Sequence, residues 1–135
     1  MPDITTSSEF PITSNSEPID QRIRAVHKSV LGSDNIIEMP TMMGSEDFSK
    51  YGLPGRHHYG GEPVPYCFWL FGGISRERYN AAPGNNLMAK LPYLPSNHQP
   101  NFAPDPEPTL RVGVYALTSA SLAYLPASSF VDKTV

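Results

Sequence analysis

A single histidine, His98, lies in a proline-rich stretch, residues 95–110, that reads PSNHQPNFAPDPEPTL. An imidazole can ligate a metal ion or move a proton near neutral pH. Prolines fix backbone angles around it, and a rigid loop suits a ligand that must be positioned in advance. His98 therefore has two interpretations, a metal ligand or a histidine of a surface loop. It has no partner in an H-x-x-x-H or C-x-x-C pattern, so spacing alone favours the surface loop.

Two adjacent carboxylates, Glu46 and Asp47, follow Gly44 and Ser45 in the sequence GSEDF. Such a pair after a glycine turn could bind a metal, contact a substrate or cap a helix. Carboxylates in a first helical turn stabilise the helix by about 0.3–1 kcal/mol because they offset its positive end. On physical grounds alone, the helix cap is the favoured interpretation.

The other histidines and the cysteine favour structural roles. His57 and His58 are adjacent in a Gly/Pro-rich loop, where neighbouring side chains of extended backbone point apart and rarely share a metal. His27 is at the edge of an apolar helical stripe, which indicates a surface or packing histidine. Cys67 lies in an apolar run and is expected to act as a small hydrophobic residue. The sequence has no phosphate-binding glycine loop and no G-x-S-x-G or H-E-x-x-H motif.

Composition and charge argue against several classes of function. A chain of 135 residues suggests about one domain. Its net charge of -3 lacks the basic footprint of a nucleic-acid binder. Its longest apolar run, residues 66–71, is far shorter than the about 20 residues of a membrane-spanning helix. The first residues lack the basic and apolar regions of a signal peptide. We therefore expect a cytoplasmic protein with neither nucleic-acid nor membrane partners.

Two helices are predicted to frame the chain. Ser16 can cap a helix over Glu17–Leu31, and Gly32 is suited to end it. A second helix is predicted from about Pro108 until Pro126 ends it. Apolar residues recur at helical spacing in both segments. They are Ile19, Ile23, Val26 and Val30 in the first, and Leu110, Val114, Leu117 and Leu122 along one side of the second.

Two strands are predicted between these helices. Residues 35–39 form a short β-type run that Pro40 stops, and residues 66–71 form a run that is apolar on both faces. The second is typical of a strand buried in a parallel sheet. Residues 74–108 form a long, Pro/Asn-rich excursion. Because two short strands make a poor sheet, the pattern predicts an α/β fold with part of its core missing.

The order of these motifs resembles a known family. GSEDF, then a buried strand that ends in glycine, then His98 in HQPNF ahead of a helix, resembles the carboxyl-terminal part of the zinc-dependent aminoacylase/carboxypeptidase family of amidohydrolases, the branch of hippurate and auxin-conjugate hydrolases. The first helix, followed by IIEMPTMM, also matches. The resemblance extends from about Phe10 to Leu125.

The resemblance implies a fold, a reaction and a set of site residues. The fold would be an incomplete three-layer α/β sheet of a zinc-peptidase-like catalytic domain (residues 16–126). Residues 1–15 would be a linker returning from a missing lid domain, and residues 127–135 a flexible tail. The reaction would be metal-dependent hydrolysis of N-acyl amino acids or related small amides, with zinc, cobalt or manganese. The site residues carried over are His98 as metal ligand, Ser45, Glu46 and Asp47 as substrate or outer-shell contacts, and Pro100 and Phe102 as supports of the loop.

The chain departs from this family in what it lacks. The family's Cys-x-His pair, its other ligands and its catalytic glutamate have no counterpart, and Cys67 precedes Phe68 and Trp69 rather than a Cys-x-His partner. We therefore expect a fragment that is inactive alone, with the missing portion of the same enzyme as its partner. The alternative is a non-catalytic α/β module that pairs or complements a partner chain through an exposed sheet edge.

Overall fold

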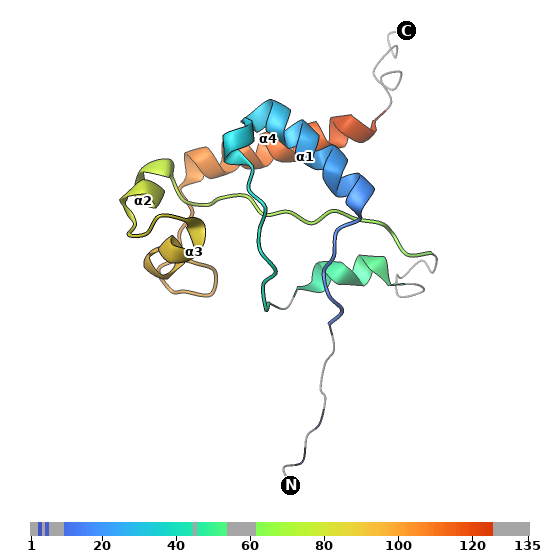
Figure 1. Cartoon of the computed structure of the whole chain (residues 1–135), viewed down its shortest axis with the longest axis horizontal. Helices are drawn as coiled ribbons and strands as arrows, with labels where there is room; N and C mark the ends of the chain where they lie inside the picture. The colour runs from blue at the N-terminus through green and yellow to red at the C-terminus, as the bar shows by residue number, and fades with distance from the viewer. Residues whose placement is uncertain (1–2, 4, 6–9, 45, 54–61, 126–135) are drawn as a thin grey trace. The chain divides into compact units, whose positions relative to one another are not determined.

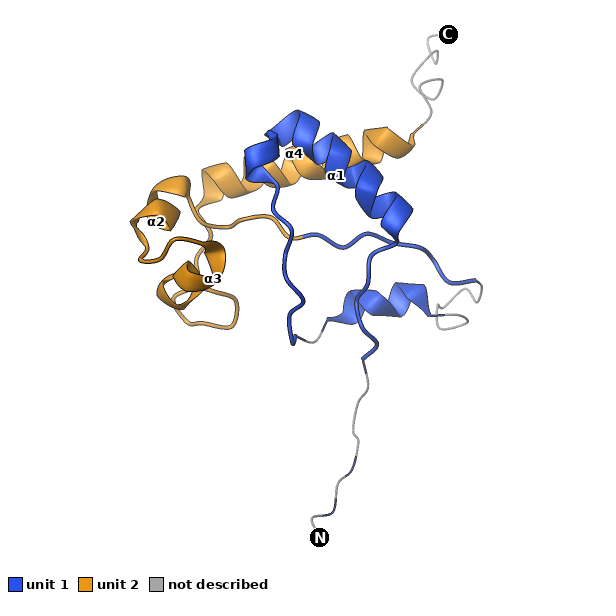
Figure 2. Ribbon diagram, viewed as in Figure 1, with its two compact units in different colours: residues 1–69 blue, residues 70–135 orange. Residues whose placement is uncertain are grey.

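The computed structural model describes residues 3, 5, 10–44, 46–53 and 62–125. Their α-helices are α1 (Glu17–Leu31), α2 (Arg76–Ala81), α3 (Leu87–Lys90) and α4 (Pro106–Tyr124) (Figure 1). Their short 3-10 helices are η1 (Ser33–Asn35), η2 (Asp47–Gly52) and η3 (Leu91–Tyr93). The chain forms two compact units, Met1–Trp69 and Leu70–Val135 (Figure 2). The domain boundaries predicted at residues 15 and 126 stay predictions.

The predicted α/β class is wrong for the part of the chain that the structure describes, which is helical and contains no strand. A strand exists only where a neighbour meets its N–H and C=O groups. Residues 37–43 are extended, but their backbone makes no hydrogen bond to another described backbone group. Residues 66–71 are extended too, and the backbones of Tyr66 and Phe68 bond to Asn15 and Ser16 rather than to a parallel strand.

Helix α1 begins and ends where the sequence predicts. Ser16 occupies the N-cap position without a side-chain cap bond, and Glu17 and Asp20 lie in the first turn. Gly32 follows with a φ of 88° and donates its N–H to the carbonyl of Lys28. This left-handed conformation is open to glycine without steric conflict. Ile23 and His27 are the buried residues of the helix, while Val30 is half exposed.

An asparagine side chain joins α1 to the extended segment of the first unit. The Asn15 amide donates to the Phe68 carbonyl at 3.0 Å and accepts from the Phe68 N–H at 2.7 Å. The same amide donates to the Asp20 carboxylate at 3.2 Å. This side chain thus replaces a β-ladder partner for Phe68.

Aromatic rings form the rest of the first unit's packing. The ring centroid of Phe48, in η2, lies 5.0–5.3 Å from the ring centroids of Tyr51, Tyr66 and Phe68. The His27 ring meets Trp69 edge to face at 5.3 Å. These distances and tilts are those at which aromatic pairs attract. The sequence left two roles open for His27, a surface histidine or a packing histidine. The structure shows the packing role.

A lysine holds α2 and α3 of the second unit together. The Lys90 ammonium donates to the carbonyls of Tyr79, Asn80 and Ala82 at 3.0, 3.4 and 2.5 Å, at the carboxyl end of α2. A positive charge there satisfies carbonyls that the helix leaves unpaired. Gly84 turns the chain between the two helices with a φ of 117°, and a Cβ on it would lie 2.8 Å from the Ala89 Cβ. Only glycine fits this turn.

The predicted second helix is present and begins two residues earlier than expected, at Pro106. The apolar side that the sequence analysis identified is exposed, with Leu110, Val114, Leu117 and Leu122 each more than half accessible. The small residues Gly113, Ala116 and Ala120 are buried instead. A Cβ on Gly113 would lie 3.2 Å from the Phe71 ring, so glycine allows the close approach. None of the described helices is long and apolar enough to cross a membrane.

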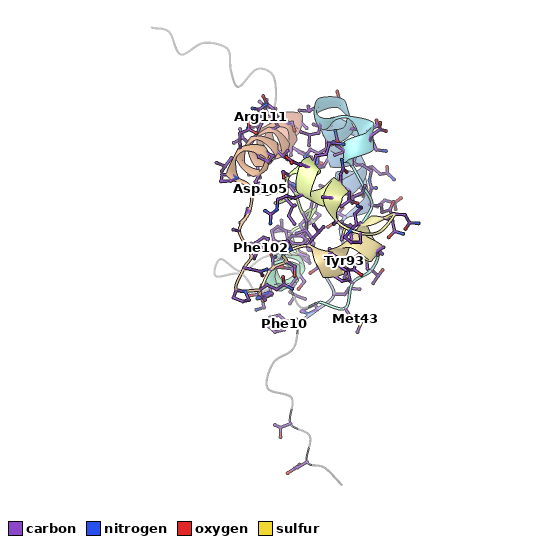
Figure 3. All side chains as sticks on the ribbon, turned by 90° about the vertical axis from the view of Figure 1, so that its left-hand side faces the viewer. Phe10, Met43, Tyr93, Phe102, Asp105 and Arg111 are labelled. Atoms are coloured by element: carbon purple, nitrogen blue, oxygen red, sulfur yellow. The ribbon has the colours of Figure 1, made fainter. Side chains whose placement is uncertain are left out.

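Asp105, the residue before α4, fixes the start of that helix to the start of α2 (Figure 3). Its carboxylate accepts from the Ser75 N–H at 2.6 Å and from the Arg78 guanidinium at 2.9 Å. Its own N–H donates to the Gly73 carbonyl at 2.8 Å. The bond from the Ser75 backbone, with Arg78 adding to it, holds the pKa of Asp105 below its usual value of 3.8.

We expect the second unit to lose stability in acid through Asp105. Because its folded pKa lies below the unfolded value, its contribution is complete above about pH 4 and is lost as pH falls through the folded pKa. The fall in melting temperature between pH 7 and pH 3, followed by circular dichroism, should therefore be smaller in Asp105→Asn than in the unmodified chain. Asp34→Asn, at an exposed position of η1, is the matched control. An equal fall in Asp105→Asn and the unmodified chain would contradict the assignment.

Candidate functional site

His98 occupies the third position of a tight turn over residues 96–99. The Gln99 N–H donates to the Ser96 carbonyl at 3.2 Å, and His98 has a φ of 68°. This hydrogen bond with a positive φ at the third residue is the pattern of a type II turn. The Gln99 side chain adds a second closure, since its oxygen accepts from the Ser96 N–H at 3.0 Å.

The backbone of His98 is unusual for its residue type. It is the one non-glycine residue with a positive φ in the described part of the chain. A left-handed residue with a Cβ costs roughly 1–2 kcal/mol, and such strain concentrates at functional sites. His, Asn and Asp bear this conformation better than other side chains. The imidazole itself is exposed, so the turn presents it to solvent.

Neighbouring residues anchor both ends of this turn. Leu94, before it, is buried and 7% exposed. After it, the Phe102 N–H donates to the Gln99 carbonyl at 3.1 Å, and the half-buried Phe102 ring lies beside Gly73. Pro100 is exposed and follows the turn directly. The supporting roles expected of Pro100 and Phe102 stay predictions, although Phe102 is placed where it can restrain the loop.

The acidic pair lies at the start of η2, as a helix cap would. Glu46 is the N-cap, and its carboxylate accepts from the Phe48 N–H at 3.2 Å. Asp47 is in the first turn, and one of its oxygens is 3.5 Å from the Lys50 ammonium. Both side chains are exposed, so contact with a substrate stays open to them. Ser45, like His57 and His58, lies outside the described residues.

No metal site is assembled by the residues that the structure describes. They contain no group of three or more His, Cys, Asp or Glu side chains that could hold an ion. His98 belongs to the second unit and the Glu46–Asp47 pair to the first, so the structure assigns no geometry between them. A catalytic zinc needs three protein ligands. The described residues by themselves therefore do not fit the metal centre that the resemblance implies.

Cys67 and Asp20 form a partly buried pair that sequence reasoning did not find. The thiol lies 3.7 Å from the Asp20 carboxylate. Burial, with the Asp20 charge, raises the pKa of Cys67 to about 11. Burial alone would raise the pKa of Asp20, but hydrogen bonds from Arg24 and Asn15 outweigh it and lower that pKa. The thiol is thereby kept protonated, which suits a structural cysteine rather than a nucleophile.

Arg78 was also not found from the sequence. It lies in α2, within the segment that the sequence predicts to be loop, and its guanidinium is oriented by Asp105. The only signal in the sequence is Ser75, whose hydroxyl oxygen caps α2 by accepting from the Arg78 N–H. A serine before a short polar segment is too common a pattern to identify one arginine.

The comparisons with known proteins give one partial similarity. A stretch of 54 residues is 41% identical to the IAA-amino acid hydrolase ILR1-like 4 of Arabidopsis thaliana. The match covers 38% of this chain and 12% of that protein, so the chain spans about an eighth of the relative. No family model matches the chain. No solved structure matches it either. This chain is therefore similar, over part of its length, to an amidohydrolase whose name describes action on IAA–amino acid compounds.

Proposed function

We propose that this chain contributes part of the site of a metal-dependent amidohydrolase that acts on N-acyl amino acids or related amides. The observation that carries the proposal is the 41% identity over 54 residues to a hydrolase of IAA–amino acid compounds. In this proposal His98 is a metal ligand, and the other ligands come from outside the described residues. The bound metal would be zinc, cobalt or manganese, and it would activate a water for attack on the amide.

The geometry of the His98 turn supports this role. A side chain that must meet a metal benefits from a backbone that is already fixed. The turn is closed twice, by the Gln99 N–H and by the Gln99 side chain. The φ of 68° is strained for a residue with a Cβ, and such strain is often found at functional sites, which supports a role for this imidazole.

The test is a chimera in which this chain replaces the carboxyl-terminal part of the Arabidopsis hydrolase. We expect hydrolysis of IAA–amino acid conjugates by the chimera with added zinc, cobalt or manganese, and none by the 135-residue chain alone, because one imidazole cannot hold a catalytic metal. His98→Ala should lower kcat/KM of the chimera at least 100-fold, while Asn97→Ala, in the same turn, should change it less than threefold. A folded chimera whose activity survives His98→Ala would overturn the proposal.

A glycine substitution separates the role of the imidazole from that of the turn. His98→Gly should stabilise the isolated chain by about 0.5–1 kcal/mol, because glycine adopts a φ of 68° without steric strain but has more entropy to lose. The same change should abolish activity of the chimera. Urea denaturation measures the first effect and the amide assay the second.

The extended segment of residues 37–43 favours a second candidate, a non-catalytic module that binds a partner by strand addition. It leaves its backbone without described backbone partners and exposes Ile37, Met42 and Met43. Met43 is labelled in Figure 3. The sheet edge expected for this role is absent from the described residues, so the extended segment would itself be the added strand. Stable co-purification with the remaining part of the hydrolase, without hydrolysis, would favour this candidate.

A further inference from the structure

Helix α4, the longest of the described helices, has an apolar stripe at its surface (Figure 1). Residues spaced alternately four and three apart lie along one line of a helix. On α4 this line, called the outer stripe below, consists of Leu110, Val114, Leu117, Ser121 and Tyr124. All five residues are exposed, and the four large ones are each 47–68% exposed. An apolar stripe of this kind normally faces a core.

The buried side of α4 has small residues instead. Its buried residues are Gly113, Ala116 and Ala120. A helix with one covered side usually places its large apolar residues there. In α4 the small residues meet the rest of the chain and the large ones face outward. This distribution is typical of a helix that is covered on both sides, so the outer stripe is suited to a second surface.

The charges of α4 restrict what that surface can be. Its two charged residues, Glu107 and Arg111, form an ion pair with each other near the start of the helix. Residues 112–124 of the helix carry no charge. A helix that lies on a membrane surface needs a polar face rich in Lys and Arg, and a nucleic-acid surface needs a basic patch. The partner of the outer stripe is therefore an uncharged, apolar protein surface.

A second copy of α4 offers such a surface with matching spacing. Leu117 is the middle residue of the outer stripe, so two antiparallel copies can meet about an axis at Leu117. Leu110 of one copy then lies beside Tyr124 of the other. Val114 likewise lies beside the smaller Ser121. The alternation of four and three is that of a coiled-coil seam, and twofold dimers are the commonest oligomers.

The ion pair at one end of α4 favours the antiparallel direction. In a parallel pair, Arg111 of one copy would lie near Arg111 of the other, and like charges oppose association. The dipoles of the two helices would also point the same way. In an antiparallel pair each charged end lies beside an uncharged end, and the helix dipoles oppose each other.

The apolar surface is large enough for a weak dimer. The half-exposed Phe71 ring lies against Gly113, which is between Leu110 and Leu117 on the helix surface, so this ring borders the outer stripe. Five large side chains that each expose about half of about 150–250 Å² offer roughly 500 Å² per copy. Two copies then bury roughly 1,000 Å², the size of weak and transient interfaces.

We propose that this chain forms an antiparallel homodimer through the outer stripe of α4, with Leu117 on the twofold axis. An interface of this size corresponds to a Kd of tens to hundreds of micromolar, on the order of 100 µM. The dimer does not depend on hydrolase activity, so the two proposals can fail separately.

The first test is sedimentation velocity of the full chain from about 5 µM to about 1 mM, a range that brackets this Kd. The average mass should rise from that of one chain towards twice that mass. Leu117→Lys and Leu117→Glu should each weaken association at least tenfold, because they place like charges on the axis. An equal mixture of the two should restore it. Met88→Lys, at an exposed position of α3, is the matched control and should leave the Kd unchanged.

Disulfide cross-linking tests the direction of the pair. Leu117→Cys should cross-link to itself under oxygen with a copper catalyst, because the axis brings its two copies together. Leu110→Cys should cross-link only in a mixture with Tyr124→Cys. Cys67 is buried, so the unmodified chain gives a low background. If Leu110→Cys cross-linked to itself as fast as Leu117→Cys, the antiparallel arrangement would be wrong.

Three further results would overturn the dimer. One is a single-chain mass at about 1 mM. Another is unchanged association in Leu117→Lys, which would move the contact elsewhere, for example to residues 37–43. The third is a monomer whose outer stripe gains protection from hydrogen exchange only with the remaining part of the hydrolase, which would then be the occupant. The cysteine variants keep the test valid if a charge at position 117 disturbs folding.

Discussion

Replacing Lys90 with methionine should lower the free energy of unfolding of the second unit by about 2–4 kcal/mol, the range for breaking a buried, charge-assisted network. Lys90 is buried, with 8% of the residue exposed, and its ammonium donates to three carbonyls at the end of α2. Methionine keeps the length and the apolar stem but leaves those carbonyls without a donor. The charge also lies over the Tyr79 ring, 5.1 Å from its centroid, and that attraction is lost too.

Urea denaturation followed by far-ultraviolet circular dichroism measures this loss, and hydrogen exchange locates it. Amides of α2 and α3 should lose protection, while those of α1 should not. Lys50→Met is the matched control, because the Lys50 side chain is 51% exposed and its ion pair with Asp47 is 3.5 Å long. The control should change stability by less than about 0.5 kcal/mol. If both substitutions had equal effects, the three carbonyl contacts would not be stabilising α2.

The thiol of Cys67 should react with a disulfide reagent at least 100-fold more slowly in the native chain than in urea. Its pKa of about 11 lies two units above the ordinary value of 9.0, so the reactive thiolate at pH 8 is roughly 100-fold rarer. Its 9% exposure limits access further. The rate is measured by the absorbance of the released thiol.

Asp20→Asn is the informative variant for this thiol. It removes the carboxylate charge that raises the pKa of Cys67 but keeps a side chain of the same shape. The native rate should rise several-fold and stay below the rate in urea, because burial is the larger cause of the raised pKa. If the thiol of the unmodified native chain reacted at a rate within tenfold of its rate in urea, the buried placement of Cys67 would be contradicted.

The sequence predicts α1 correctly at both ends because its signals are local. Ser16 and Gly32 each lie directly beside the helix that they delimit. The periodicity was a poorer guide to burial, since Val30 is half exposed and His27 is buried against Trp69. Which polar residue is buried depends on a partner more than forty positions away, and local pattern does not contain that information.

The two predicted strands are absent from the described residues for the same physical reason, because a strand also depends on a partner that is distant in sequence. Val, Ile and aromatic content indicates that a segment is suited to a sheet, but a strand also requires another strand beside it. For residues 66–71 the neighbours are Asn15 and Ser16, which form single bonds and not a ladder. The segment is therefore extended without being part of a sheet in the described chain.

The sequence predicted that the loop around His98 is rigid, but it did not predict the backbone conformation of the turn. The prolines around His98 indicated a rigid loop, and the structure has a closed turn there. The positive φ of His98 had no signal, because glycine and asparagine are the usual markers of that conformation. Arg78 and Lys90 gain their roles from contacts with Asp105 and with the end of α2, which no spacing rule identifies.

The edge-to-face contact between Trp69 and His27 gives the chain a built-in optical reporter. Trp69 is the one tryptophan of the sequence, and it belongs to the first unit. Its ring lies 5.3 Å from the imidazole of α1, so indole emission responds when α1 separates from residues 66–69. The second unit has tyrosines and no tryptophan. Emission excited at 295 nm therefore follows the unfolding of one unit only, and its comparison with circular dichroism tells whether the two units unfold together.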